Sequence, residues 1–310
     1  MTLVQLEYLV AVDTFKSFGL AAEKCFVTQP TLSMQIQKLE EHLNVKLFDR
    51  TKKPISPTDI GIQVIAQARI VLNESQRIKE IIESQKQELS GDLKIGVIPT
   101  VAPYMLPEVI TVMLSKYPKL NISIWEYTTD EIIQNLKSGI LDCGILATPL
   151  VDNFLTETPL YYEGFVIYLN NTSQIAKKKF LNADDLLLEN IWLLNEGHCM
   201  RSQVLNICKN IKSSKNPFLN YNTGSLETLI RMVNLNGGAT LIPEMYLKEL
   251  SPEDLKKIRR FVNPQPVREI GLVTPKNYIK KRMLSVLKEE ILASIPKHML
   301  IANKKDIIKL

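Results

Sequence analysis

The hydrophobic pattern of the chain changes at Ser90 and Gly91, and this change limits the possible folds more than any other feature. Before it, apolar residues recur three or four positions apart, which is typical of helices. After it, short β-prone runs alternate with amphipathic helical stretches, as in α/β units with mainly parallel sheets. At 310 residues the chain is also too long for one small core. The sequence therefore predicts a helical N-terminal part followed by an α/β part.

The first fifty residues are predicted to form three helices. Ser17 can cap the second helix, and Thr28 can cap the third, with Pro30 in a first turn where a missing N–H costs nothing. The second and third helices, joined by a tight turn over 26–28, make a helix-turn-helix unit, although an ordinary helical hairpin fits the helices alone. The positions expected in the core are Leu3, Leu6, Leu9, Val10, Phe15, Leu32, Ile36, Leu39 and Leu43.

A basic segment with two prolines follows these helices. Residues 49–58 (DRTKKPISPT) predict a small hairpin with a basic tip, a wing. A long helix is then expected from Thr58 and Asp59 to about Gln85. Its apolar or small residues alternate by four and three, as in a coiled coil, so we expect it to pair with a second copy of the chain. These seam positions are Val64, Ala68, Val71, Ser75, Ile78 and Ile82.

The elements predicted beyond Gly91 fall into two series, which indicates two lobes with a ligand cleft at the carboxyl ends of their strands. The first series contains strands at 93–99, 121–127 and 141–147 and helices near 103–116 and 130–137. The second contains strands at 165–169, 191–195, 218–222, 238–243 and 268–273 and helices near 200–209 and 226–234.

The formal net charge is +5, but residues 1–60 hold seven basic and seven acidic side chains, and the excess lies in 276–310. The total charge therefore does not indicate DNA binding, whereas the local cluster at the wing tip does, because phosphate contacts are short-range. The chain has no run of eighteen apolar residues and no secretory signal, which predicts a cytoplasmic protein without a membrane partner. Its four cysteines are then expected to be reduced.

Residues 21–50, AAEKCFVTQPTLSMQIQKLEEHLNVKLFDR, resemble the winged helix-turn-helix of LysR-type regulators. The match runs through AA, VTQPTLS, QI, LE and LF-R. The resemblance implies an α/β protein in which an all-α winged helix-turn-helix and a linker helix precede a bilobed periplasmic-binding-protein-like effector domain. The implied domains are a DNA-binding domain (1–58), a dimerising linker helix (59–89), a regulatory domain (90–298) and a basic tail (299–310), with lobe I at 92–162 and 269–296 and lobe II at 163–268.

The same resemblance implies double-stranded promoter DNA and RNA polymerase as partners, and a homo-oligomer that pairs through the linker helix into dimers and tetramers. On the third helix, Leu32, Ile36 and Leu39 must face the core, which leaves the other face for the DNA groove. Glutamine can hydrogen-bond adenine there, and small hydroxyl or methyl groups can meet thymine. The candidate DNA-binding residues are Gln29, Pro30, Thr31, Ser33 and Met34 on the helix and Arg50, Lys52 and Lys53 on the wing. Simple solvation is the alternative for the two wing lysines.

Residues 193–203, LLNEGHCMRSQ, with Cys208 nine residues after Cys199, resemble the sensor loop of the LysR-type regulators that respond to hydrogen peroxide. Supporting matches are IPTVAPY (98–104), LDC (141–143) and TGSLETL (223–229). The resemblance implies that Cys199 reacts with peroxide, that Cys208 resolves the product, and that a thiol reductant resets the protein. It also implies a peroxide pocket, formed by Thr100, Thr129, His198 and Arg201. Ser202 departs from the acidic residue, and Val4 from the arginine, that are common at those positions.

The residues around Cys199 suit this chemistry. A thiol attacks peroxide only as thiolate, and the start of a predicted helix with His198 and Arg201 beside it favours negative charge. If 199–208 is helical, the Cα atoms of Cys199 and Cys208 are separated by about 13 Å, whereas a disulfide requires roughly 7 Å or less. The helix must therefore rearrange before the two cysteines can join, which would make it a redox switch.

Other interpretations stay open from the residues. The two cysteines could be unpaired packing residues, or could join His198 in a zinc site, although a fourth ligand is not evident. A LysR-type regulator could instead respond to a small molecule between the lobes, and a thiol peroxidase could carry structural N-terminal helices. We expect neither an enzyme nor a bound metal or cofactor. Of the remaining residues, Cys25 and Cys143 are expected in cores and His42 and His298 at the surface.

Overall fold

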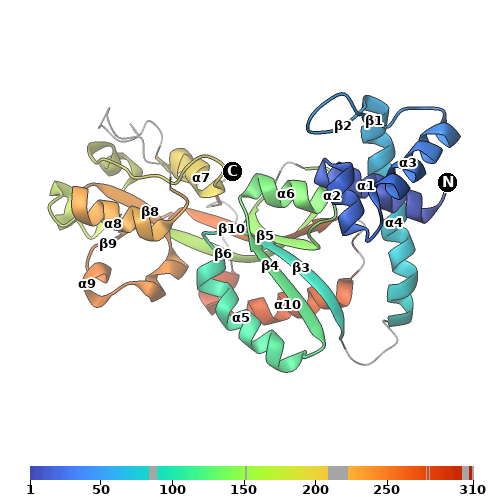
Figure 1. Ribbon diagram of the computed structural model, residues 1–310. Coiled ribbons are helices and arrows are strands. Elements are labelled where there is room, and N and C mark those ends of the chain that lie inside the picture. The colour runs from blue at the N-terminus through green and yellow to red at the C-terminus, as the bar shows by residue number, and fades with distance from the viewer. Residues whose placement is uncertain are drawn as a thin grey trace. The chain divides into compact units, whose positions relative to one another are not determined.

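The computed structural model describes residues 1–83, 89–150, 152–208, 223–276, 278, 280–301 and 307–308. The chain divides into two compact units (Figure 1): a helical unit of Met1–Gln87 with Tyr278–Lys280, and an α/β unit of Glu88–Asn277 with Lys281–Leu310. Within these ranges, no helix combines the length and the apolar character that a membrane crossing requires.

The helical unit has the elements that the sequence predicts. The Ser17 hydroxyl accepts the Leu20 N–H at 3.3 Å, and the Thr28 hydroxyl accepts the Thr31 N–H at 3.4 Å, so both predicted helix caps are confirmed. The elements are α1 (Leu3–Phe15), α2 (Phe18–Lys24), α3 (Gln29–Leu43), β1 (Phe48–Asp49), β2 (Ser56–Pro57) and α4 (Asp59–Glu83). The two short strands pair antiparallel, which confirms the hairpin after α3.

The prediction of core residues in the helical unit is partly wrong. Leu3 and Phe15 are 44% and 38% exposed, because α1 turns Leu6, Leu9 and Val12 inward instead. Cys25, the C-cap of α2, is half-buried and packs against the edge of this core rather than inside it. On α3, Leu32, Ile36 and Leu39 are fully buried as predicted.

The predicted seam of α4 is divided between two environments. Val64, Ala68 and Val71 pack into the core of the helical unit itself, where they cover α1 and its neighbours. Farther along, Ile78 is 64% exposed. The side chain of Ile82 lies outside the described residues. The early seam positions therefore belong to the core of the helical unit, whereas Ile78 lies at its surface.

The α/β unit contains a mixed sheet rather than the two mainly parallel sheets that the sequence predicts. Its strands follow the order β4-β3-β5-β10-β6-β9-β7, with β8 paired to β6. The chain passes from lobe I to lobe II along β6 and returns along β10, so these two neighbours run antiparallel. The strands are β3 (Gly91–Val97), β4 (Leu120–Glu126), β5 (Cys143–Thr148), β6 (Leu155–Leu169), β7 (Phe180–Leu181), β8 (Ala239–Pro243), β9 (Ile258–Phe261) and β10 (Val267–Pro275).

The helices of the α/β unit begin close to where the sequence places them. The predicted ones are α5 (Ala102–Lys116), α6 (Thr129–Lys137), α7 (Cys199–Ile207) and α8 (Leu226–Asn236). The sequence prediction missed α9 (Pro252–Leu255), α10 (Lys281–Ser294) and the 3₁₀ turns η1 (Gln174–Lys177), η2 (Ala183–Leu188), η3 (Glu244–Glu249) and η4 (Lys297–Leu300). Of the predicted strand 191–195, only a single bridge from Ile191 to Ala239 forms, and the predicted strand 218–222 lies outside the described residues.

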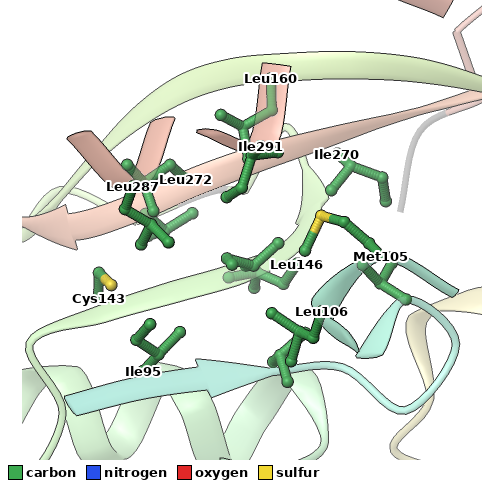
Figure 2. Close-up of a cluster of buried hydrophobic side chains, with 14 of the residues drawn as sticks. Ile95, Met105, Leu106, Cys143, Leu146, Leu160, Ile270, Leu272, Leu287 and Ile291 are labelled. Atoms are coloured by element: carbon green, nitrogen blue, oxygen red, sulfur yellow. The ribbon is translucent and has the colours of Figure 1, made fainter. Parts of the chain in front are cut away.

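Each lobe has its own hydrophobic cluster. The lobe I cluster packs β3, β5 and β10 against α5 and α10, and Figure 2 shows Cys143 among its aliphatic side chains, which confirms that Cys143 is a core residue. The lobe II cluster is built from the second half of β6, β8, α7 and α8. In the basic tail, the Ile308 N–H donates to the Val267 carbonyl at 2.8 Å, so the tail reaches the start of β10.

Candidate functional site

Cys199 is the first residue of α7. Its half-buried side chain packs against the lobe I cluster, although α7 itself belongs to lobe II. No side chain caps the start of this helix, because the N-cap residue His198 makes no capping hydrogen bond. A helix start without a side-chain cap, with the positive end of the helix dipole, is a setting that attracts anions.

Cys208 lies at the opposite end of the same helix and inside the other cluster. α7 spans Cys199–Ile207, and Cys208 is its C-cap, which confirms the predicted helix. The helical rise separates the two Cα atoms by about 13 Å, and neither cysteine is bonded to another. Cys208 is 1% exposed within the lobe II cluster, and this burial raises the pKa of its thiol to about 12. The Cys208 thiol therefore stays protonated in this fold.

The positive group that acts on Cys199 comes from a strand far away in the sequence. Arg268, on β10, is fully buried and donates to Glu163 on β6 and to Thr100. Burial alone would lower the pKa of Arg268, but the charges of Glu163, Tyr161 and Cys199 and the hydrogen bond to Glu163 outweigh it and raise that pKa. Sequence reasoning missed Arg268 and Glu163, since no local motif marks them.

His198 and Thr129 come from two helix starts that face each other. Gly197, just before His198, approaches Thr128 at the start of α6, where an added Cβ would lie 3.5 Å from the Thr128 methyl group. His198 is buried, which lowers its pKa, while Glu131 on α6 opposes that shift. The imidazole is thus neutral near pH 7, and the positive charge expected from it is absent. Among the described residues, the buried Thr129 hydroxyl has no hydrogen-bond partner.

The remaining predicted pocket residues are placed differently. Thr100, in the turn before α5, uses its hydroxyl and carbonyl oxygens to hold Arg268 at 2.9 and 3.0 Å. Arg201 donates one of its guanidinium N–H groups to the Leu194 carbonyl at 2.9 Å, within lobe II. Sequence reasoning missed Gln203, one turn after Cys199 on α7: it is fully buried, and neither atom of its amide has a partner within the described chain.

The three candidate zinc ligands are not together. His198 and Cys199 lie at one end of α7 and Cys208 at the other, so one ion cannot contact all three in this fold. In the part of the chain that the structure describes, no group of three or more His, Cys, Asp or Glu side chains is arranged to hold a metal.

The third helix presents the predicted candidate DNA-binding residues at the surface. Gln29, Pro30, Thr31 and Met34 are exposed, opposite the buried Leu32, Ile36 and Leu39. The turn before this helix carries Phe26, which is 95% exposed on a residue with φ of 55°. Sequence reasoning missed Phe26, because an aromatic side chain there indicates a core residue by default.

The hairpin is fixed to the third helix through a buried carboxylate. Glu40 accepts the backbone N–H groups of Leu47 and Phe48 at 2.8 and 3.4 Å. Its other oxygen lies 3.5 Å from Arg50, whose guanidinium also donates to Ser33 and covers the Phe18 ring. Arg50 and Ser33 therefore hydrogen-bond to each other, whereas Lys52 and Lys53 are exposed.

Two family models together match almost the whole chain. Residues 3–62 match the bacterial regulatory helix-turn-helix protein model of the lysR family, and residues 86–294 match the LysR substrate binding domain. The chain belongs to the LysR family. The layout that this LysR-family chain shares with its relatives is the one expected from its sequence: a winged helix-turn-helix followed by a two-lobed α/β unit.

The named relatives of this LysR-family chain are regulators of gene expression. It is 35% identical over 296 residues to the "Hydrogen peroxide-inducible genes activator" of Haemophilus influenzae, covering 94% of this chain and 97% of that protein. It is 37% identical over 273 residues to the "DNA-binding transcriptional dual regulator OxyR" of Escherichia coli, covering 88% and 89%. A solved structure of a full-length OxyR variant from Pseudomonas aeruginosa matches with a TM-score of 0.79 at 31% identity, covering 95% of this chain and 99% of that one.

Proposed function

We propose that this LysR-family chain is a DNA-binding transcription regulator that senses hydrogen peroxide through Cys199 and is switched by a reversible Cys199–Cys208 disulfide. The observation that carries the proposal is the arrangement of α7. Its first residue is a half-buried cysteine at an uncapped helix start near Arg268, and its last position is a cysteine buried in the other lobe. The names of the relatives agree with this role.

The proposed chemistry has two steps. The Cys199 thiolate attacks one peroxide oxygen, the O–O bond breaks, and hydroxide leaves and takes up a proton to give water and a sulfenic acid. The sulfur of Cys208 then attacks the Cys199 sulfur, the S–O bond breaks, and a second water leaves. Together, two thiols and one peroxide yield one disulfide and two waters. A thiol reductant of the cytoplasm reverses the change.

Several contacts support the reactivity and the switch that we propose. The uncapped start of α7 and the Arg268 charge favour the thiolate, while the partnerless Thr129 hydroxyl and Gln203 amide offer hydrogen bonds to peroxide. Thr100 holds Arg268, and His198 closes the pocket as a neutral group. Arg201, fixed to Leu194, contributes by keeping the helix start in place. Because burial keeps the Cys208 thiol protonated, the second step requires α7 to open.

For DNA binding we propose that the exposed face of α3 enters the major groove and that the wing contacts the backbone. Gln29, Thr31 and Met34 would contact bases, with Pro30 and Ser33 at the helix start, while Lys52 and Lys53 contact phosphates and Arg50 braces the wing. The chain would act as a homotetramer built from dimers that pair through α4, and would recruit RNA polymerase at promoters. The proposal places it in the cytoplasm, as a regulator rather than an enzyme.

One experiment tests the switch. Reduced full-length protein is treated with stoichiometric peroxide, and peptides that contain Cys199 and Cys208 are analysed by mass spectrometry. We expect a loss of two hydrogens that joins the two cysteines, together with a changed footprint on promoter DNA. Cys199→Ser should abolish both effects. A footprint that still responds in Cys199→Ser would refute the redox switch and favour an effector bound between the lobes, whereas many turnovers of peroxide without DNA affinity would indicate a thiol peroxidase.

A further inference from the structure

Glu163 and Arg268 form a fully buried ion pair where the chain passes between the lobes. They face each other in the register of β6 and β10, and both are 0% exposed. One carboxylate oxygen of Glu163 accepts Nε and Nη2 of Arg268 at 3.0 and 2.8 Å. The other oxygen accepts the Met245 backbone N–H at 2.8 Å. Glu163 therefore fixes the guanidinium from the lobe II side, while Thr100 fixes it from lobe I.

One N–H group of the Arg268 guanidinium is not used by the hydrogen bonds to Glu163 and Thr100. A guanidinium has five N–H groups, and the bonds to Glu163 and Thr100 use four of them: one on Nε, one on Nη1 and two on Nη2. The fifth, on Nη1, has no hydrogen-bond partner among the described residues. Cys199 is one of the groups whose charge acts on this guanidinium. The orientation that Glu163 imposes thus decides where the free donor points.

The charge of Glu163 also matters to Cys199. With both members ionised, the pair has no net charge, so Glu163 offsets part of the attraction that the Arg268 cation exerts on an anion at Cys199. The other titratable groups that face Arg268 are Tyr161 on β6 and Tyr104 on α5, and burial raises the pKa of each phenol, which keeps both neutral. His198, beside Cys199, is neutral as well, and its partner Glu131 lies on α6.

We propose that Glu163 is a positioning residue for Cys199: it aims the Arg268 guanidinium and offsets its charge, and so sets how readily the Cys199 thiol ionises. The inference deepens the proposed peroxide chemistry and rests on it for its biological meaning. Its physical content concerns thiol reactivity alone, and that can be measured with a reagent other than peroxide.

Removing the charge of Glu163 and removing the charge of Arg268 should change the alkylation rate of Cys199 in opposite directions. Glu163→Gln keeps the side-chain size but leaves the Arg268 charge without a counter-ion, so the thiolate at Cys199 becomes more favourable. We expect alkylation of Cys199 by iodoacetamide at pH 6 to accelerate about tenfold, which corresponds to a shift of one pH unit in the ionisation midpoint. Arg268→Met leaves the Glu163 charge alone, and alkylation should slow about tenfold. A pair with a purely structural role would change both variants in the same direction.

The test measures the alkylation rate of Cys199 between pH 5 and 9 in reduced full-length protein, quantified by mass spectrometry of the peptide. Glu290→Gln serves as the matched control, since it removes the same charge from a pair with Lys116; its midpoint should equal that of the parent. An unchanged midpoint in Glu163→Gln, or shifts of the same sign in Glu163→Gln and Arg268→Met, would overturn the proposal.

A second comparison covers the case in which Glu163→Gln does not fold. Replacing both members by methionine removes both buried charges, a change that proteins often tolerate. Adding Glu163→Met to Arg268→Met should accelerate alkylation, because it removes the remaining anion, and equal or slower alkylation contradicts the inference. If peroxide fails to oxidise Cys199 in the parent protein, the proposed function falls, while these alkylation rates still decide the role of Glu163.

Discussion

Cys208 ends the helix that Cys199 begins, yet the two side chains pack into different hydrophobic clusters. Cys199 contacts the core of lobe I, and Cys208 is buried in the core of lobe II. A covalent bond between them cannot form inside an intact α7, because about 13 Å of helix separates their Cα atoms. In the proposed switch, the reactive thiol would lie at one end of the helix and the barrier to disulfide formation at the other.

Removing the second thiol should stop the reaction half-way. In Cys208→Ser, peroxide should convert Cys199 to a sulfenic acid that persists, since no thiol is left on α7 to displace water from it. Labelling with a dimedone reagent should trap one adduct at Cys199, and the DNA footprint should stay in its reduced form. Cys143→Ser is the matched control, because Cys143 is buried in the lobe I core. A full footprint change in Cys208→Ser would contradict the proposed disulfide.

The partnerless polar groups near Cys199 predict a specific loss of peroxide reactivity. Thr129→Val and Gln203→Leu keep side-chain volume but remove a buried hydroxyl and a buried amide that have no partner in the described fold. We expect each to slow oxidation by peroxide about tenfold or more, through one lost hydrogen bond to the reacting oxygens. Alkylation by iodoacetamide should change little. Stopped-flow rates with the two reagents separate the cases, and equal slowing with both would indicate a distorted Cys199 instead.

His198 predicts a pH dependence of stability. Burial lowers the pKa of its imidazole in the folded state, so the unfolded chain binds a proton more tightly there. The contribution of His198 to the free energy of unfolding is complete above its ordinary pKa of about 6.5 and is lost as the pH falls below that value. His198→Asn should therefore flatten the decline of the urea midpoint between pH 7 and pH 5. His42→Asn, at an exposed position of α3, should leave the decline unchanged.

Glu40 predicts a stability effect in the helical unit. Glu40→Ala leaves the buried N–H groups of Leu47 and Phe48 without an acceptor and frees Arg50. We expect a loss of about 2–4 kcal/mol in the free energy of unfolding and weaker DNA binding, because the wing is no longer fixed to α3. Glu41→Ala, which removes an exposed partner of Gln37, should cost less than about 0.5 kcal/mol. Urea titrations of the full-length variants measure both, and equal losses would refute this role of Glu40.

The correct predictions concern features that depend on interactions between residues close together in the sequence. The caps at Ser17 and Thr28 and the start of α7 at Cys199 depend on residues three or four positions apart, so a local pattern is sufficient. Arg268 meets Glu163 across 105 positions, and only the register of β6 with β10 brings them together. No local pattern could indicate that contact.

The errors have similar causes. Phe15 has the right spacing for a core residue, but it lies at the last position of α1, where the helix leaves the core. The predicted parallel pairing is confirmed for β3 with β4 and β5. It is wrong for β6 and β10, which run antiparallel through the junction of the lobes, and strand composition does not encode this. The hydrogen bond from Arg201 to the Leu194 carbonyl was also not indicated by the sequence, because it depends on how the loop before α7 folds back on the helix.

The separate burial of the two sulfurs has a consequence for how the proposed disulfide form would return to the reduced fold. To join, at least one sulfur must leave its cluster and take neighbours such as Met200 and Val204 partly into water. Exposure of this apolar surface to water costs free energy, which favours the return of these side chains to the core. In the proposed switch, reburial of these side chains would favour the re-formation of α7 once a reductant has cleaved the disulfide.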